Sequence, residues 1–205
     1  MAVLPMFPLG TVLLPSAAIP LHVFEPRYRA LVHDCLASDR EFGIVLIARG
    51  SEVGGEDQRT DAGTVARIVE AVELPDGRWA IGAVGVRRVL VRGWLPDDPY
   101  PLAELDDWPD AAPSPAHGVA LERTVTLLRR ALALAAEAGD HGAPATVELS
   151  EDPVLAGYQA SAVAPIGPHD RQRLLVASSP DVRLAALAEM LEGSIEVLRL
   201  RLAEG

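Results

Sequence analysis

The chain has 205 residues, of which 49% are hydrophobic and 4% aromatic, and its formal net charge at pH 7 is −11. At this length about 70% of the unfolded surface can be buried, so one large domain or two small ones can fold without a disulfide. The negative charge disfavours sequence-independent binding to nucleic-acid phosphates, which needs clustered basic residues.

The chain carries no signal for export or for a membrane. Its single cysteine, Cys35, excludes an internal disulfide and fits a reducing compartment. No apolar run approaches the ~18 residues that a membrane span requires, and residues 1–20 lack the basic start of a signal peptide. We therefore expect a soluble, cytoplasmic protein.

All 18 basic residues are arginine, so the chain contains no lysine. A Walker A phosphate loop needs its lysine to reach the β and γ phosphates. A Ser-Lys peptidase needs a lysine of lowered pKa as its base. Neither kind of enzyme can be built from these residues.

The first third of the chain predicts two short strands and a helix. The apolar runs 4–9 and 19–23 are interrupted or bounded by prolines, which are typical of strand ends and edges. Pro26 suits the first position of a helix, and we expect that helix to span residues 26–37.

The next segments predict short strands joined by tight turns, which favours a small, closed or nearly closed β-barrel. Gly85 is expected to interrupt the chain between two of the strands, and residues 49–62 are expected to form an exposed, mobile loop. The predicted strands are 42–48, 63–74, 78–84, 86–94 and 102–105.

A change of composition marks the middle of the chain. Residues 97–110 contain six acidic side chains and no basic one, and residues 110–118 have the composition of a linker. We place a domain boundary here, between residues 1–110 and 111–205.

Beyond the boundary the apolar period becomes helical. We expect four helices, over 118–138 and 152–164, one that opens at Pro168, and a long last one over about 180–203 with Ser179 as its N-cap. Leaving the apolar stripe of the last helix in water would forfeit on the order of 10 kcal/mol. We expect it to pack on the other helices in a small bundle, rather than in an intermolecular coiled coil.

Several of these segments, in their order and spacing, resemble the N-terminal substrate-binding domain of the Lon family of ATP-dependent proteases (peptidase S16). The resemblance implies an α+β fold, with a PUA-like pseudo-β-barrel that carries one inserted helix, followed by a C-terminal helical bundle. One departure is Ala164, where the family usually has leucine before the proline. The matching segments are 4–9, 19–29, 40–47, 52–55, 63–68, 75–79 and 165–175.

The resemblance implies a bacterial, non-catalytic module that binds unfolded or hydrophobic polypeptide segments and acts in protein quality control or proteolysis. A separate ATP-dependent protease is a candidate partner, and the oligomeric state is left open. An apolar groove or an open strand edge is the expected means of binding.

Aromatic and arginine side chains are the usual anchors of protein interfaces, which makes five residues peptide-binding candidates. Core packing is the favoured interpretation for Phe24, whereas function and packing are close to even for the two tryptophans. The candidates are Phe24, Arg27, Tyr28, Trp94 and Trp108.

No residue pattern indicates catalysis, a cofactor or a metal. Cys35 and His33 are two apart on the predicted helix and face different sides, and the five histidines show no metal-ligand spacing. Two other functions stay open. One is a small-molecule or RNA-binding sensor on the PUA-like barrel, and the other is a hydrolase whose Ser, His and Asp meet only in the fold.

Overall fold

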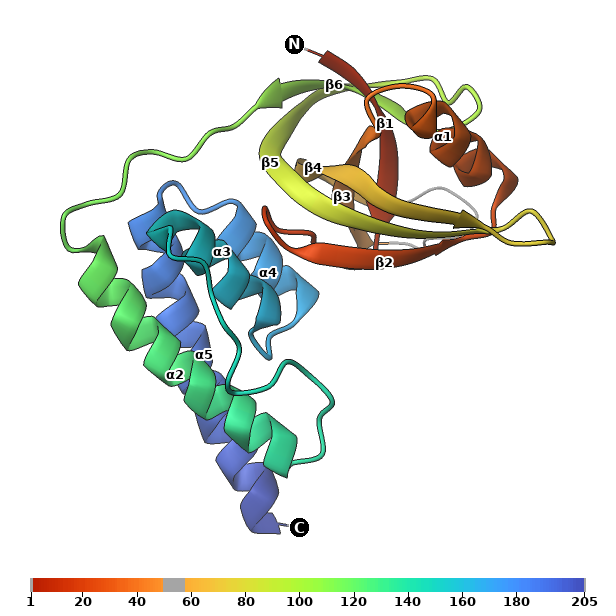
Figure 1. Ribbon diagram of the computed structural model, residues 1–205. Helices are drawn as coiled ribbons and strands as arrows, with labels where there is room; N and C mark the ends of the chain where they lie inside the picture. The colour runs from red at the N-terminus through yellow and green to blue at the C-terminus, as the bar shows by residue number, and fades with distance from the viewer. Residues whose placement is uncertain (1, 50–57, 205) are drawn as a thin grey trace. The chain divides into compact units, whose positions relative to one another are not determined.

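The computed structural model describes residues 2–49 and 58–204, which contain six strands and five helices in an α+β arrangement (Figure 1). The chain divides into two compact units, Met1–Pro109 and Asp110–Gly205. All six strands and one helix belong to the first unit, and the other four helices belong to the second.

The first unit is a ring of strands with one strand added outside it. β5 pairs with β4 along most of its length and with β6 through its second half, so the order β5-β4-β3-β1-β6 returns to β5. Among the described strands β2 pairs with β5 alone, along its first half, from Ala18 opposite Val84 to Val23 opposite Trp79. The strands are β1 (Ala2–Leu9), β2 (Ala18–Val23), β3 (Glu41–Arg49), β4 (Gln58–Glu73), β5 (Trp79–Leu95) and β6 (Leu102–Asp107).

The alternation of side chains along the strands builds two apolar clusters in this unit. One cluster is packed among the ring strands and consists of Met6, Val45, Val65, Val89, Ala103 and Leu105. The other includes the buried face of α1 (Pro26–Leu36), where Tyr28, Leu31, Val32 and Cys35 pack against strand residues. The helix therefore contributes to the core, as its apolar spacing indicates.

The predicted break at Gly85 is wrong, because β5 runs as one strand from Trp79 to Leu95, although its pairing with β4 shifts register between Gly85 and Arg87. Gly85 is needed for a close approach of backbones instead. Its N–H donates to the carbonyl of Ala17 at 2.9 Å, and its carbonyl accepts from the N–H of Ser16 at 2.8 Å. A Cβ at this position would strike the backbone carbonyl of Leu14. The glycine thus lets a connecting segment lie directly on a continuous strand.

The predicted loop over residues 49–62 is also partly wrong. β3 includes Arg49, and β4 already begins at Gln58, where Ile47 pairs with Arg59 and Ala62 pairs with Leu90. Local composition is a weak guide here, because pairing on both sides holds polar residues in a strand. Residues 50–57 lie outside the part of the chain that the structure describes.

The second unit is built on two long helices. α2 and α5 pack on each other, and their buried residues share one apolar cluster with residues of α3 and α4. Ser179 caps α5, because its Oγ accepts a hydrogen bond from the N–H of Val182 at 3.2 Å. None of the helices described is long and apolar enough to cross a membrane. The helices are α2 (His117–Glu137), α3 (Pro153–Val163), α4 (Pro168–Leu175) and α5 (Pro180–Glu204).

A buried arginine ties this unit together. The side chain of Arg183 in α5 is only 1% exposed and lies over the ring of Tyr158, 3.8 Å from its centroid. Its Nη2 donates to Asp110 Oδ1 at 2.7 Å and to the Tyr158 hydroxyl at 2.8 Å, and its Nε donates to the carbonyl of Leu174 at 3.1 Å. The Tyr158 hydroxyl in turn donates to Asp110 Oδ2 at 2.6 Å. The charge is therefore paired and hydrogen-bonded, as a buried charge requires.

Candidate functional sites: a pocket beside β2 and a cleft among the helices

The first candidate site lies beside β2, the strand that stands outside the ring. β5 is the only described strand that pairs with β2, so the other edge of β2 has no strand partner among the described residues. A pocket of about 180 Å³ lies beside it. The pocket is lined by Phe7 and Leu9 of β1, by Pro20, Leu21, His22 and Val23 of β2, and by Phe24, Glu25 and Tyr28.

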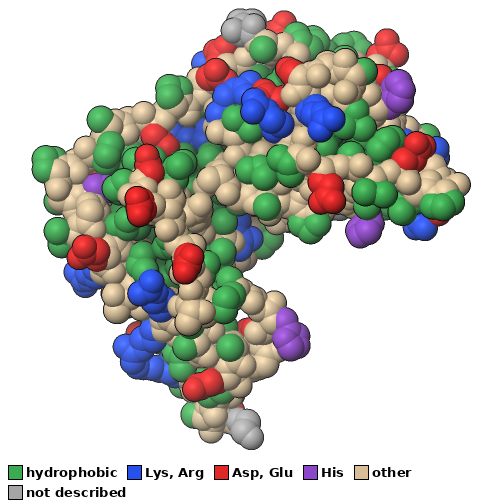
Figure 2. Space-filling view, in the orientation of Figure 1, with side chains coloured by type: hydrophobic (Ala, Val, Ile, Leu, Met, Phe, Trp, Pro, Cys, Tyr) green, Lys and Arg blue, Asp and Glu red, His purple; other side chains and the backbone are tan. Residues whose placement is uncertain are grey.

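Phe24 is an exposed aromatic residue of this pocket. It follows β2 and precedes Glu25, the N-cap of α1, so it belongs to neither a strand face nor a helix face. Its side chain is 56% exposed, and the expectation that it packs in the core is wrong. Figure 2 shows other hydrophobic side chains at the surface of the strand unit, and the exposed ones include Val69 and Val72 of β4.

Tyr28 forms the wall of the pocket on the helix side, and Arg27 lies against it. Tyr28 is 3% exposed and its ring stacks on Phe7, with centroids 4.1 Å apart and an interplanar angle of 9°. The guanidinium of Arg27 lies 4.6 Å from the centre of the Tyr28 ring, and its Nε donates to Glu25 Oε2 at 3.1 Å. A stacked aromatic pair and an ion pair therefore hold this wall in place, whereas Phe24 extends toward solvent.

A hydrogen bond fixes the other end of α1. The Tyr100 hydroxyl donates to Asp34 Oδ2 at 2.8 Å. This bond lowers the pKa of Asp34. Burial, together with the nearby Asp34 carboxylate, raises the pKa of Tyr100 to about 12. The residues that precede β6 thus anchor α1, on which the pocket depends.

The two candidate tryptophans each lie under an arginine. Trp94 in β5 stacks with Arg59 at 4.4 Å, and Trp108, just after β6, stacks with Arg88 at 4.4 Å. The backbone N–H of Trp108 donates to the carbonyl of Arg88, six positions before Trp94 along β5. At about 3.3 Å per residue, roughly 20 Å of strand separates the two ring sites.

The structure therefore brings three of the five sequence candidates together. Phe24 directly follows Val23, which pairs with Trp79 at the start of β5, whereas Trp94 lies near the end of this strand. Phe24, Arg27 and Tyr28 line or flank one pocket, and Trp94 and Trp108 are located elsewhere on the same unit.

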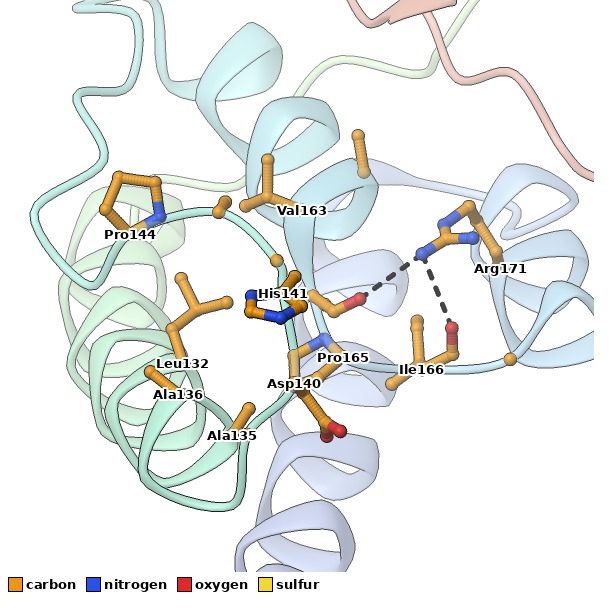
Figure 3. Close-up of a pocket in the computed structure, with 16 residues that line it drawn as sticks. Leu132, Ala135, Ala136, Asp140, His141, Pro144, Val163, Pro165, Ile166 and Arg171 are labelled. Atoms are coloured by element: carbon orange, nitrogen blue, oxygen red, sulfur yellow. Dashed lines mark hydrogen bonds between the residues drawn. The ribbon is translucent and has the colours of Figure 1, made fainter.

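The second candidate site is a cleft within the helical unit, and no pattern in the sequence predicts it. It has a volume of about 1070 Å³ and lies between the end of α2, the loop 139–144 and the end of α3 (Figure 3). Aliphatic side chains line much of it, including Leu132, Val163 and Ile166. The only related signal in the sequence is the loop after the first long helix, which gives no indication of a cavity.

Arg171 of α4 is the cation of this cleft. Its Nη2 donates to the carbonyl oxygens of Ala164 at 3.2 Å and Ile166 at 3.3 Å, as the dashed lines in Figure 3 show. Burial lowers the pKa of Arg171, and its Nε is buried without an acceptor among the described residues. The carboxylate of Asp140, which also lines the cleft, accepts a hydrogen bond from Arg201 at 3.1 Å.

Neither site has the ligands of a metal centre. Within residues 2–49 and 58–204, no group of three or more His, Cys, Asp or Glu is placed to hold a metal ion. Cys35 is buried, and burial raises the pKa of its thiol to about 12, so it is not poised as a nucleophile. His33 is exposed on another side of the same helix.

The fold is α+β, and each of its two units carries one candidate site. The chain belongs to the ATP-dependent protease La (LON) substrate-binding domain family, whose model matches residues 3–193. The resemblance inferred from the sequence is thereby confirmed.

Curated relatives and solved structures agree with this assignment. The chain is 29% identical to Lon protease 2 of Herpetosiphon aurantiacus over 96% of its own length and 24% of that protein. It is 25% identical to Lon protease 1 of Myxococcus xanthus over 96% of its length and 25% of that protein. The chain thus spans about a quarter of the length of these relatives.

Two solved structures have the same fold. A Lon N-terminal domain protein from Xanthomonas campestris is 30% identical and superposes with a TM-score of 0.66 over 91% of this chain and 97% of that one. The N-terminal domain of the Mycobacterium avium complex Lon protease, at 19% identity, has a TM-score of 0.67 over 93% of this chain and 98% of that one. The second likeness concerns the fold alone.

Proposed function

We propose that this chain is a non-catalytic polypeptide-binding module that recognises protein substrates in proteolysis or protein quality control. Membership of the substrate-binding domain family supports a role in substrate recognition related to Lon protease. The observation that carries the proposal is the exposed Phe24 at a pocket beside β2, whose outer edge pairs with no other strand among the described residues. A separate ATP-dependent protease in the cytoplasm is the proposed partner.

The pocket suits one apolar side chain of an extended chain. Its volume of about 180 Å³ is of the order of one large side chain, and Phe24 adds apolar contact area at its edge. The free edge of β2 would supply main-chain hydrogen bonds, as when a peptide adds a strand to a sheet. Substrate segments with a bulky apolar residue in an otherwise extended stretch are therefore the proposed ligands.

Pro20 limits the strand addition. It lies in the middle of β2 and has no N–H, and a proline within a sheet normally points its nitrogen toward a free edge. The free edge then offers the carbonyl oxygens of Ala18, Pro20 and His22 but the N–H groups of only Ala18 and His22. We expect binding to depend more on the pocket than on the ladder.

The remaining proposals follow from the residues themselves. With no lysine, the chain supplies neither a Walker A loop nor a Ser-Lys dyad, so we propose that it is not an enzyme. The division at residues 110 and 111, the PUA-like description of the barrel and the packing of the four helices as a bundle stay proposals. A small-molecule or RNA sensor is the second-ranked function, and the net charge of −11 counts against RNA.

The test is fluorescence anisotropy of a labelled, permanently unfolded protein titrated with this chain, beside the same label on a compact folded protein. We expect saturable binding to the unfolded probe alone. Phe24→Ala should weaken it at least tenfold, which is about 1.4 kcal/mol. Val69→Ala, at an equally exposed valine of β4, is the matched control and should leave the affinity unchanged. If the two variants change the affinity equally, the pocket beside β2 is not the binding site.

A further inference from the structure

The cleft of the helical unit is apolar but contains one cation that no acid neutralises. No described Asp or Glu lies within ion-pair distance of Arg171, and its hydrogen bonds to described residues are the two from Nη2 to backbone carbonyls. Asp140, the acid that lines the cleft, is paired with Arg201 instead. An apolar cleft with an uncompensated guanidinium favours a ligand that is apolar and carries one negative charge.

Capping of α3 explains only part of this arrangement. The carbonyl oxygens of Ala164 and Ile166 follow the last turn of α3, and Nη2 of Arg171 donates to both, adding to the bond that Ala164 accepts from the N–H of Ile166 at 2.8 Å. Its Nε is left buried without an acceptor, and its Nη1 makes no hydrogen bond to a described residue. Because Nε is fully buried, the N–H groups of Nη1 are the ones left to a ligand in the cleft.

The charge of Arg171 and its one available donor group suit a carboxylate. In a guanidinium the Nε–H shares its edge with Nη2, which is already bonded to Ala164 and Ile166, so Nη1 is the group left to donate to a carboxylate oxygen. In a polypeptide, an α-carboxylate next to apolar side chains occurs at a carboxyl terminus that ends in apolar residues. The aliphatic side chains of α2, which Figure 3 shows across the cleft from Arg171, would contact those last side chains together with Val163 at the end of α3.

We propose that this cleft binds the apolar carboxyl terminus of a polypeptide, with the terminal carboxylate held by Arg171. The site is distinct from the pocket beside β2 and shares with the proposed function only the class of ligand. It would bind the end of a polypeptide, whereas the pocket beside β2 would bind an internal extended segment.

The test compares two fluorescent nonapeptides of one sequence that ends in Leu-Ala-Leu, one with a free carboxyl terminus and one amidated. Anisotropy titrations should show the free acid binding at least tenfold more tightly than the amide. Arg171→Gln should abolish this preference, and Arg171→Lys should keep a smaller one because its ammonium is a point charge on a more flexible stem. Equal affinities for acid and amide, or an unchanged preference in Arg171→Gln, would overturn the proposal.

Further variants keep the result interpretable if Arg171→Gln fails to fold. Ala136→Trp fills the cleft from an exposed position of α2 without changing Arg171, and it should also abolish binding of the free acid. Phe24→Ala should leave binding of the free acid unchanged. Binding of laurate by the wild-type chain without binding of either peptide would overturn the assignment to a polypeptide. If the wild-type chain binds the unfolded probe but not the free-acid peptide, this inference is wrong and the proposed function stands.

Discussion

Replacement of Arg183 by methionine tests whether the buried ion pair holds the helical unit together. The substitution keeps a side chain of similar length at a position that is 1% exposed, but removes the bonds to Asp110, Tyr158 and the Leu174 carbonyl. Removing one partner of a buried ion pair costs about 3 to 5 kcal/mol, because the other charge stays buried and uncompensated. The Asp110 side chain is 16% exposed and keeps its bond from Tyr158, so we expect the lower end, about 3 kcal/mol.

The assay is urea unfolding followed by two signals. The three tryptophans, Trp79, Trp94 and Trp108, all belong to the first unit, so their fluorescence reports on the barrel. Far-UV circular dichroism at the helical minimum reports mainly on α2 to α5. Arg183→Met should shift the dichroism midpoint, and the double variant with Asp110→Leu should recover most of the loss because no unpaired charge remains. A loss below about 1 kcal/mol in Arg183→Met would refute the reasoning.

Four smaller predictions concern the first unit and α5. The Cys35 thiol, buried and with its pKa raised to about 12, should not react with a thiol reagent at pH 8 until urea unfolds the chain, and a fast stoichiometric reaction of native protein would contradict this. Because the pKa of Tyr100 is raised from 10.0 to about 12, its contribution to stability is complete below pH 10 and lost as pH rises through 12. In unfolding titrations, Tyr100→Phe should lose less stability than the wild type between pH 10 and pH 12. Identical pH profiles of the two proteins would refute this prediction. Gly85→Ala should destabilise by about 1 to 3 kcal/mol through its clash with the Leu14 carbonyl. Gly193→Ala in α5, where a Cβ meets nothing, should stabilise by about 0.5 to 1 kcal/mol, and thermal unfolding of both variants checks the opposite signs.

Local signals in the sequence were enough to place the helices. Proline at the first position and apolar residues three and four apart predict the first helix at 26–37, and α1 spans Pro26–Leu36. The same rules predict the last helix at about 180–203, against Pro180–Glu204, and the Ser179 cap is confirmed. Such signals succeed because capping and amphipathic spacing act within a few residues of each other.

Features that depend on distant residues could not be predicted. Arg183 lies in a helix whose sequence gives no sign that this arginine is buried, because its partner Asp110 is 73 positions away. In the local sequence Gly85 suggests a break between two strands, yet in the structure it lies within one strand, in close contact with the segment at Leu14. The surroundings of Arg171 could not be predicted from nearby residues either, because the cleft beside it is formed by α2, α3 and a loop between them. Only the fold brings these partners together.

The pairing of β1 sets the order in which the barrel can form. Its first half pairs with β6, with Ala2 opposite Leu105, and its second half pairs with β3, with Leu9 opposite Leu46. During synthesis, β1 leaves the ribosome long before β6 and must wait for that last strand of its unit before the ring can close. Closure of so long a loop makes folding slow, in the range of milliseconds to seconds for barrels of non-local pairing. Until then the apolar β1 is itself an exposed, unfolded segment, of the kind that this chain is proposed to bind.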